Sequence, residues 1–321
     1  MQPMKLQCAV KGYVWGGTRL HTQFDLPMPE DKDRLAEAWV LSCHRDGEDV
    51  ITNGKFAGRT LSDVLANEGK AFCGTNAAAF DFFPVLVKLI DAADNLSVQV
   101  HPSDAYALEH EGQLGKTEAW FILDCAEDAE IIYGFAQEMT KDEFRAAIKD
   151  GTLLDKVRRV KVKPGELYFI PSGTLHAICR GILLAEVQQN SNVTYRVYDY
   201  GRLVDGKPRD LHIAQALDVT NLSPMENGGK PLGPPQKKDG YTETLLTQCE
   251  YFTAYCLNIE EKAALNVDGT SFVSLVGLEG NAVLLHEDNA LTLYKGESIF
   301  LPAGLGRVEI LGKAQVLMTK V

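Results

Sequence analysis

Four polar side chains with metal-binding chemistry lie in three short segments of the chain. Gln99 and His101 occur in LSVQVHPSD, Glu118 occurs in GKTEAW, and His176 closes the segment GELYFIPSGTLH. Imidazole nitrogens and carboxylate oxygens bind divalent transition metals, and a catalytic site keeps one coordination position open for water or substrate. These residues predict a metal site with two histidines, one glutamate and Gln99 as a neutral fourth ligand.

Strand patterns explain how these side chains could meet. Polar and apolar residues alternate over 96–101, which puts three polar side chains on one strand face, namely Ser97, Gln99 and His101. Residues 165–170 predict another strand, and the following Pro and Gly predict a turn that aims His176 back toward the interior. We interpret the remaining histidines as hydrogen-bonded structural residues: His21, His44, His110, His212 and His286.

Longer stretches of the chain resemble a known family. Residues 165–176 resemble the second cupin motif, and residues 99–102 with 116–118 resemble the first motif as type I mannose-6-phosphate isomerases carry it. Four further segments resemble that family in the same order: 13–17, 36–39, 83–92 and 186–202. The resemblance is strong over residues 8–220 and weaker beyond, and the length of the chain is similar to the short bacterial form.

This resemblance implies an isomerase that interconverts D-mannose 6-phosphate and D-fructose 6-phosphate through an enediol or enediolate. It implies one Zn²⁺ per chain at the four polar residues above. It leaves open whether Gln99 binds the ion directly. Zinc can act as a Lewis acid that polarises the sugar carbonyl. The resemblance also places Lys116 in the active site, Arg196 near C1 and C2, and Ser97 and Arg202 against the substrate phosphate.

Two charged residues, Arg196 and Glu186, are also candidate site residues because of the sequence around them. Arg196 lies on a predicted strand, and an arginine that faces a protein interior is costly unless it meets an anion. Glu186 is an acid inside the apolar run LLAEV, where it could accept a substrate hydroxyl, shuttle a proton or pair with an arginine. The sequence leaves the general base open between a carboxylate, a metal-bound hydroxide and an imidazole such as His101.

Two other function classes fit the same residues. Two histidines and one carboxylate in a β-barrel are also the metal ligands of nonheme Fe(II) oxygenases. A sugar-phosphate-binding module without enzymatic activity is the second alternative. The cationic Lys116 and Arg196 favour an anionic sugar, and an open coordination position is unlike a structural zinc site, which four protein ligands normally close.

Composition excludes several classes of protein. The chain has 321 residues, a hydrophobic content of 45% and a formal net charge of −12, which disfavours contact with nucleic acid or anionic membranes. We find no apolar stretch of about 20 residues and no secretion signal at the N-terminus, so we expect a cytoplasmic protein. The seven cysteines lack CxxC spacing and are expected to be reduced. Oligomeric state cannot be inferred from these features.

The order of the motifs predicts a mainly β protein with two cupin (jelly-roll) barrels and a few short helices. Residues 1–235 would form the metal-binding domain and residues 236–321 a degenerate cupin-like domain, joined by a Gly- and Pro-rich crossing over 221–240. Residues 296–307 repeat the Gly and Pro spacing of 165–176 without its histidine, so no second metal site is expected. Thr60 and Thr140 each predict the start of a helix.

Overall fold

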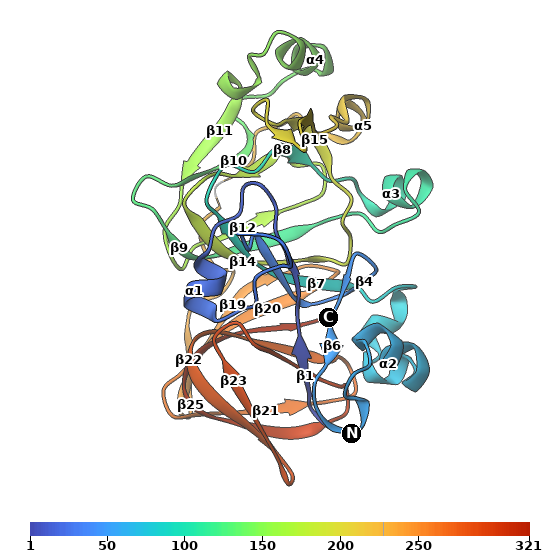
Figure 1. The fold of residues 1–321 in the computed structure, drawn as a ribbon, viewed down its shortest axis with the longest axis vertical. Helices are drawn as coiled ribbons and strands as arrows, with labels where there is room; N and C mark the ends of the chain where they lie inside the picture. The colour runs from blue at the N-terminus through green and yellow to red at the C-terminus, as the bar shows by residue number, and fades with distance from the viewer. Residues whose placement is uncertain (227) are drawn as a thin grey trace.

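The computed structural model describes residues 1–226 and 228–321, which fold mainly into β-strands with a few short helices. Three larger sheets have six, five and ten strands. In Figure 1 the first two occupy the upper part and the third the lower part. Two further sheets contain two strands each: β4 (Cys43–His44) with β5 (Gly47–Glu48), and β16 (Leu203–Val204) with β17 (Lys207–Pro208). The predicted mainly β class is confirmed.

The six-stranded sheet supplies one wall of the upper part. Its strands pair antiparallel in the order β12-β9-β14-β7-β3-β2. The strands are β2 (Ala9–Lys11), β3 (Glu37–Leu41), β7 (Val85–Ala92), β9 (Glu118–Cys125), β12 (Leu167–Ile170) and β14 (Ile182–Gln189). Every residue of β7 and β14 is buried, including Lys88 and Glu186. Buried charges need partners of opposite sign, so this wall must bring such groups together.

The five-stranded sheet forms the opposite wall, in the order β11-β10-β13-β8-β15. Its strands are β8 (Val98–Val100), β10 (Glu130–Phe135), β11 (Val157–Lys161), β13 (His176–Ile178) and β15 (Tyr195–Tyr198). One apolar core contains Trp120 and Leu184 from the six-stranded sheet together with Ile131 and Ile178 from this one. The two sheets therefore pack face to face, as in a sandwich.

The ten-stranded sheet combines both ends of the chain. Its order is β18-β19-β20-β25-β22-β24-β1-β6, with β21 paired to β25 and β23 to β22. The strands are β1 (Met4–Gln7), β6 (Val50–Ile51), β18 (Gln236–Lys238), β19 (Tyr241–Gln248), β20 (Thr253–Ile259), β21 (Lys262–Val267), β22 (Val273–His286), β23 (Asn289–Tyr294), β24 (Ser298–Leu301) and β25 (Gly306–Lys320). Met4 pairs with Phe300, so the N-terminal strand belongs to the C-terminal sheet (Figure 1).

The helices are short and lie outside the sheets. They are α1 (Arg19–Phe24), α2 (Leu61–Glu68), α3 (Asp104–His110), α4 (Lys141–Lys149) and α5 (Ile213–Val219), with 3-10 turns η1 (Gly54–Phe56), η2 (Lys70–Phe72), η3 (Asn76–Ala79) and η4 (Leu153–Asp155). Both predicted helix starts are confirmed, because Thr60 caps α2 and Thr140 forms a reciprocal capping box with Glu143 in α4. Among the described residues no helix has the length and apolar character needed to span a bilayer.

The glycines of the repeated Gly-Pro-Gly segment have similar φ angles in both copies. Gly165 and Gly296 both have φ of 86°, while Gly173 and Gly304 have φ of 85° and 77°. These left-handed values favour glycine over residues with a side chain. The first turn leads to His176 at the start of β13, and the second leads to β25, whose first residues contain no histidine.

The predicted closure into two barrels is not seen in the described part of the chain, because each of the three large sheets has an open strand order. The first half of the expected crossing over 221–240 packs against the upper part, where Pro224 bridges Phe135 and the Gly229 N–H donates to the Leu167 carbonyl. Its second half contains β18 and belongs to the ten-stranded sheet. Asn227, within that crossing, lies outside the described residues.

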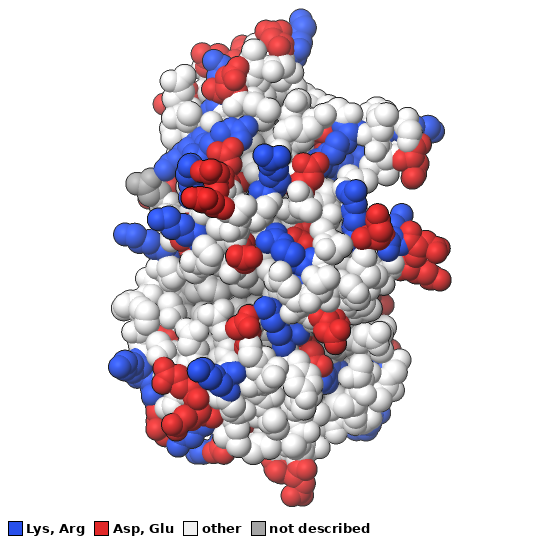
Figure 2. Space-filling view, turned by 60° about the vertical axis from the view of Figure 1, so that its left-hand side comes forward, with Lys and Arg blue, Asp and Glu red and all other residues white. Residues whose placement is uncertain are grey.

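Charged side chains of both signs are mixed over the surface. On the face drawn in Figure 2, Lys and Arg side chains lie beside Asp and Glu side chains. Exposed pairs such as Arg145 with Asp142 and Lys161 with Asp128 follow this pattern. These pairs carry no net charge, and each contributes little to stability; the formal charge of −12 comes from the excess of 44 Asp and Glu over 32 Lys and Arg residues.

Candidate metal centre

Three buried side chains from the two facing sheets converge at the predicted metal site. His101 follows β8, Glu118 begins β9 and His176 begins β13. One ligand atom from each of the three lies within 4.8 Å of the other two. The side chains are almost completely buried, with at most 1% of each residue exposed. The turn before β13 is tied to this point because the Gly173 N–H donates to the His101 carbonyl at 2.8 Å.

Hydrogen bonds fix which nitrogen of each imidazole faces the centre. The Nδ1 atoms of His101 and His176 lie 2.8 Å from the Val193 and Thr174 carbonyls. Carbonyl oxygens only accept, so Nδ1 carries the proton and Nε2 keeps its lone pair. Burial lowers the pKa of both histidines, that of His176 to about 3, and both rings are therefore neutral at physiological pH.

The remaining donor atoms suit a divalent cation. His176 Nε2 and Glu118 Oε1 lie 3.4 Å apart, and neither has a hydrogen-bond partner among the described residues. Buried polar atoms without partners are rare in folded proteins and are typical of sites for an ion or water. Two neutral imidazoles and one carboxylate form a ligand set for zinc and related metals, with room for further ligands.

Lys116 places a positive charge among the same atoms. Its Nζ atom lies 2.5 Å from Glu118 Oε2 and 3.2 Å from His101 Nε2. Burial, with Glu186 nearby, raises the pKa of Glu118 to about 8 even though Lys116 acts against this shift. A bound divalent cation would stabilise the ionised carboxylate and lower that pKa.

Glu186 connects the centre to a second lysine. Its Oε1 atom lies 3.7 Å from Lys116 Nζ and 3.3 Å from Lys88 Nζ, and its Oε2 atom accepts a 2.9 Å hydrogen bond from Trp120 Nε1. Burial alone would raise the pKa of Glu186, but the two lysines and the indole outweigh it and lower the pKa to about 2. Glu186 is thus a stable carboxylate between two cations.

Lys88 and Glu37 were not among the predicted site residues. Lys88 Nζ lies 3.6 Å from Glu37 Oε2, which also accepts a 2.7 Å hydrogen bond from Trp39 Nε1. Two tryptophan–glutamate pairs therefore flank one buried lysine. The available signal was a single lysine in the otherwise largely apolar segment 85–92, because a cation in a buried strand requires anionic partners.

Arg196 and Gln99 share a row of the five-stranded sheet with His176. Gln99 is the pairing partner of Arg196 on one side and of His176 on the other. Residues directly opposite on antiparallel strands project to the same face, so Gln99 and Arg196 are on the His176 face. Gln99 Oε1 accepts a 3.1 Å hydrogen bond from Ser97 Oγ, and Arg196 Nη1 donates to the Asp210 carbonyl at 2.9 Å.

The two expected phosphate contacts lie at the beginning of β8. Ser97 is 3% exposed and directly precedes the strand. Arg202 Nη1 donates to the Asn95 carbonyl, and Arg202 Nη2 donates to Asp199 Oδ1 at 2.6 Å. Both residues are thus at the end of β8 opposite His101.

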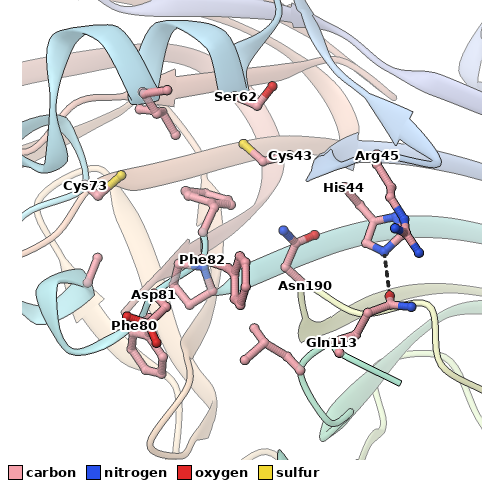
Figure 3. A pocket seen from close by; sticks show the side chains of 17 residues that line it. Cys43, His44, Arg45, Ser62, Cys73, Phe80, Asp81, Phe82, Gln113 and Asn190 are labelled. Atoms are coloured by element: carbon pink, nitrogen blue, oxygen red, sulfur yellow. Dashed lines mark hydrogen bonds between the residues drawn. The ribbon is translucent and has the colours of Figure 1, made fainter. Parts of the chain in front are cut away.

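A separate cavity of about 450 Å³ lies beside β4, and none of the expected site residues lines it. Figure 3 shows Cys43, Cys73, Phe82 and Asn190 around this space. His44 Nε2 lies 3.3 Å from Gln113 Oε1 at its edge (Figure 3). That contact agrees with the interpretation of His44 as a hydrogen-bonded structural residue.

Comparisons with known proteins agree with the motifs and the geometry. Residues 4–131 match the catalytic domain of type I phosphomannose isomerase, and residues 242–321 match the cupin domain of mannose-6-phosphate isomerase. The chain is 38% identical to mannose-6-phosphate isomerase ManA of Bacillus subtilis over 320 residues, which cover 99% of this chain and 98% of the relative.

Solved structures show the same relationship. A crystal structure of mannose 6-phosphate isomerase from Bacillus subtilis is 38% identical and superposes with a TM-score of 0.92 over 100% of both chains. A zinc-bound mannose 6-phosphate isomerase shares the fold at 19% identity, with a TM-score of 0.76 over 99% of both chains. Because the 38% identity extends over nearly the whole length, the chain belongs to the type I mannose-6-phosphate isomerase family, a family of isomerase enzymes.

Proposed function

We propose that the chain interconverts mannose 6-phosphate and fructose 6-phosphate with one zinc ion held by His101, Glu118 and His176, and with Gln99 as a further ligand. The observation that carries this proposal is the orientation of the two buried imidazoles. Both Nδ1 atoms are used by carbonyls, so both Nε2 atoms face the centre beside the Glu118 carboxylate; His176 Nε2 has no partner among the described residues, and His101 Nε2 contacts Lys116 Nζ, which a bound metal would have to displace. Zinc as the ion is also consistent with the zinc-bound relative that shares this fold.

The reaction moves a proton between two adjacent sugar carbons. Removing the proton from C2 of the aldose gives an enediol or enediolate, and returning a proton to C1, with transfer of the hydroxyl proton from O2 to O1, gives the ketose. Bound zinc would supply a Lewis acid that polarises the oxygens of these carbons. Lys116 and Arg196 are the cations available to stabilise negative charge on oxygen. Glu186 would orient Lys116, because its pKa of about 2 keeps it ionised 3.7 Å from that cation.

We also propose a phosphate-binding end of the site, a division into two domains and a location for the reaction. Ser97 and Arg202 would contact the substrate phosphate at the beginning of β8. Residues 1–235 would form the catalytic domain and residues 236–321 a cupin-like domain that binds no metal, both related to the jelly roll. The substrate is a small sugar phosphate, and we propose a cytoplasmic location for the reaction.

The test is a coupled assay of mannose 6-phosphate conversion before and after chelation and after zinc is restored. We expect His176→Ala to lose the metal and to lower activity at least about a hundredfold, because one ligand and its lone pair are removed. His286→Ala is the matched control. His286 Nδ1 lies 3.1 Å from the Arg307 carbonyl in the C-terminal sheet, so this variant should keep both metal and activity.

A second variant separates metal binding from catalysis. Arg196→Ala should retain zinc and lower kcat by about 10²–10³-fold, as expected for the loss of one charge that stabilises the transition state. Full activity of metal-free His176→Ala protein would contradict the proposal. Oxygen consumption by an iron-loaded sample would instead support an oxygenase, and sugar-phosphate binding without turnover by the zinc protein would support a binding module.

A further inference from the structure

Three arginines gather around a single buried carboxylate next to the proposed active site. Arg209 donates from Nε to Asp199 Oδ2 at 2.7 Å and from Nη2 to Oδ1 at 2.5 Å. Arg202 Nη2 donates to the same Oδ1 atom at 2.6 Å. Arg196, on β15, lies three residues before Asp199. Asp199 therefore holds two guanidinium groups side by side through charged hydrogen bonds.

Positive charge exceeds negative charge among the part-buried groups of this cluster, because Asp210, the carboxylate nearest Arg196 besides Asp199, is exposed. Asp199 is 6% exposed and is the carboxylate shared by Arg202 and Arg209, while Asp94 lies 3.8 Å from Arg202 and is largely exposed. Burial lowers the pKa of Arg196, and the nearby charge of Arg209 adds to this shift. The Nε atoms of Arg196 and Arg202 are buried without a hydrogen-bond partner among the described residues. A part-buried excess of positive charge favours binding of an anion.

The position of the cluster matches one end of an elongated substrate. Arg202 contacts the Asn95 carbonyl, Arg196 pairs in register with Gln99, and Ser97 lies between those two positions. A strand advances about 3.3 Å per residue, so Ser97 is about 7 Å from Gln99 along the chain. Arg196 therefore lies next to the proposed metal ligand Gln99, and Arg202 lies farther along the strand, at about the length of a short carbon chain that ends in a phosphate.

We propose that Arg209 is a further phosphate-recognition residue, and that Asp199 is the positioning residue that holds it beside Arg202 and Arg196. The three guanidinium groups would bind the dianionic phosphate of a sugar phosphate through planar, paired N–H donors. The identity of that substrate rests on the proposed function. A purely structural Arg209 would bind Asp199 alone, and the two roles predict different behaviour toward inorganic phosphate.

The first experiment measures binding of inorganic phosphate by titration calorimetry to the zinc-loaded protein. Arg209→Gln should weaken phosphate binding about tenfold or more, because charged hydrogen bonds to the anion are lost. Arg145→Gln is the matched control, since Arg145 is exposed on α4 and paired with Asp142, and it should bind phosphate like the unaltered protein. Equal phosphate affinity in the Arg209→Gln and unaltered proteins would overturn the proposal.

Chelated protein provides the second arm of the experiment. Phosphate should still bind after chelation and remain weaker in Arg209→Gln. Binding that disappears on chelation and is insensitive to Arg209→Gln would place the ion on the metal and contradict the proposal. Neither titration requires turnover. If the isomerase assay fails, the titrations therefore still show whether Arg209 binds phosphate.

Steady-state kinetics and a conservative variant complete the test. For mannose 6-phosphate, Arg209→Gln should raise KM about tenfold with a smaller change in kcat, because phosphate contacts are made in both ground and transition states. Arg209→Lys keeps the charge without the paired donors and should bind phosphate with intermediate affinity. If Arg209→Gln fails to fold, Arg209→Lys decides: unchanged phosphate affinity in that variant would refute paired recognition.

Discussion

At the residue scale, the buried histidines of the metal centre should make stability depend on pH when the metal is removed. The pKa of His176 falls from 6.5 to about 3 on folding because the ring is buried. Between these values the unfolded chain binds more protons, so the free energy of unfolding should decrease as pH falls below 6.5. The decrease should reach about 1.4 kcal/mol per pH unit for this group.

A matched variant is needed because protonation of Glu118 changes the free energy of unfolding in the opposite direction. Its pKa rises from 4.5 to about 8 on folding, so protonation of Glu118 favours the folded state as pH falls through that range. Urea unfolding of chelated protein between about pH 7 and pH 5 should therefore compare the unaltered chain with His176→Gln. The unaltered chain should lose stability more steeply, and identical pH dependence would show that His176 is not the titrating group.

Sequence could identify the side chains whose residue type and spacing alone indicate metal binding. His101, Glu118 and His176 were expected from type and spacing, and the structure brings them together. The partners of Lys88 were not predicted, because Glu186 and Glu37 approach it only through the registers of β14 and β3 with β7. Those registers depend on contacts between strands far apart in the chain.

At the element scale, the two Gly-Pro-Gly segments allow a matched comparison. Gly173 has φ of 85°, and an added Cβ would lie 3.0 Å from the Val219 carbonyl oxygen. Alanine in a left-handed conformation costs about 1–2 kcal/mol, so Gly173→Ala should destabilise the protein and displace the turn that leads to His176. We expect lower thermal stability and weaker zinc binding, measured by calorimetry and by competition with a chelator.

Gly304→Ala is the control for that prediction. Gly304 has φ of 77°, and its nearest contact for a Cβ would be Met1 Cε at 3.4 Å. A similar backbone strain should lower stability here, whereas zinc affinity should stay unchanged because this turn leads to no metal ligand. Equal loss of zinc affinity in both variants would mean that the effect comes from global destabilisation.

The sequence predicted structure formed by neighbouring residues better than pairing between strands far apart in the chain. The capping box of Thr140 and Glu143 was predictable because all its hydrogen bonds lie within four residues. Neither the open order of the three sheets nor the pairing of β1 with β24 was predicted. Residues 4–7 carry no signal for a partner almost 300 residues away, since strand pairing is chosen by packing in the assembled fold.

At the scale of the whole molecule, the two proposed domains share structure. Strands β1 and β6 belong to the ten-stranded sheet, although they precede residue 236. One apolar core includes Val85 and Leu167 from the six-stranded sheet and Phe300 and Leu317 from the C-terminal sheet. The metal centre is formed entirely by residues before 236, but one of the sheets that supply it packs on this shared core.

This shared core predicts that residues 1–235 cannot hold the metal centre alone. Without β24, strand β1 loses its neighbour, and Val85 and Leu167 are exposed to water at a cost of about 1.5–3 kcal/mol for each large apolar side chain. The isolated fragment should unfold without a cooperative transition and bind zinc far more weakly, as judged by circular dichroism and metal analysis.

Co-expression of residues 1–235 with residues 236–321 is the control, because it restores every contact except one peptide bond. A fragment that unfolds cooperatively and retains stoichiometric zinc would show that the catalytic domain folds independently, with β1 as a removable addition to the C-terminal sheet.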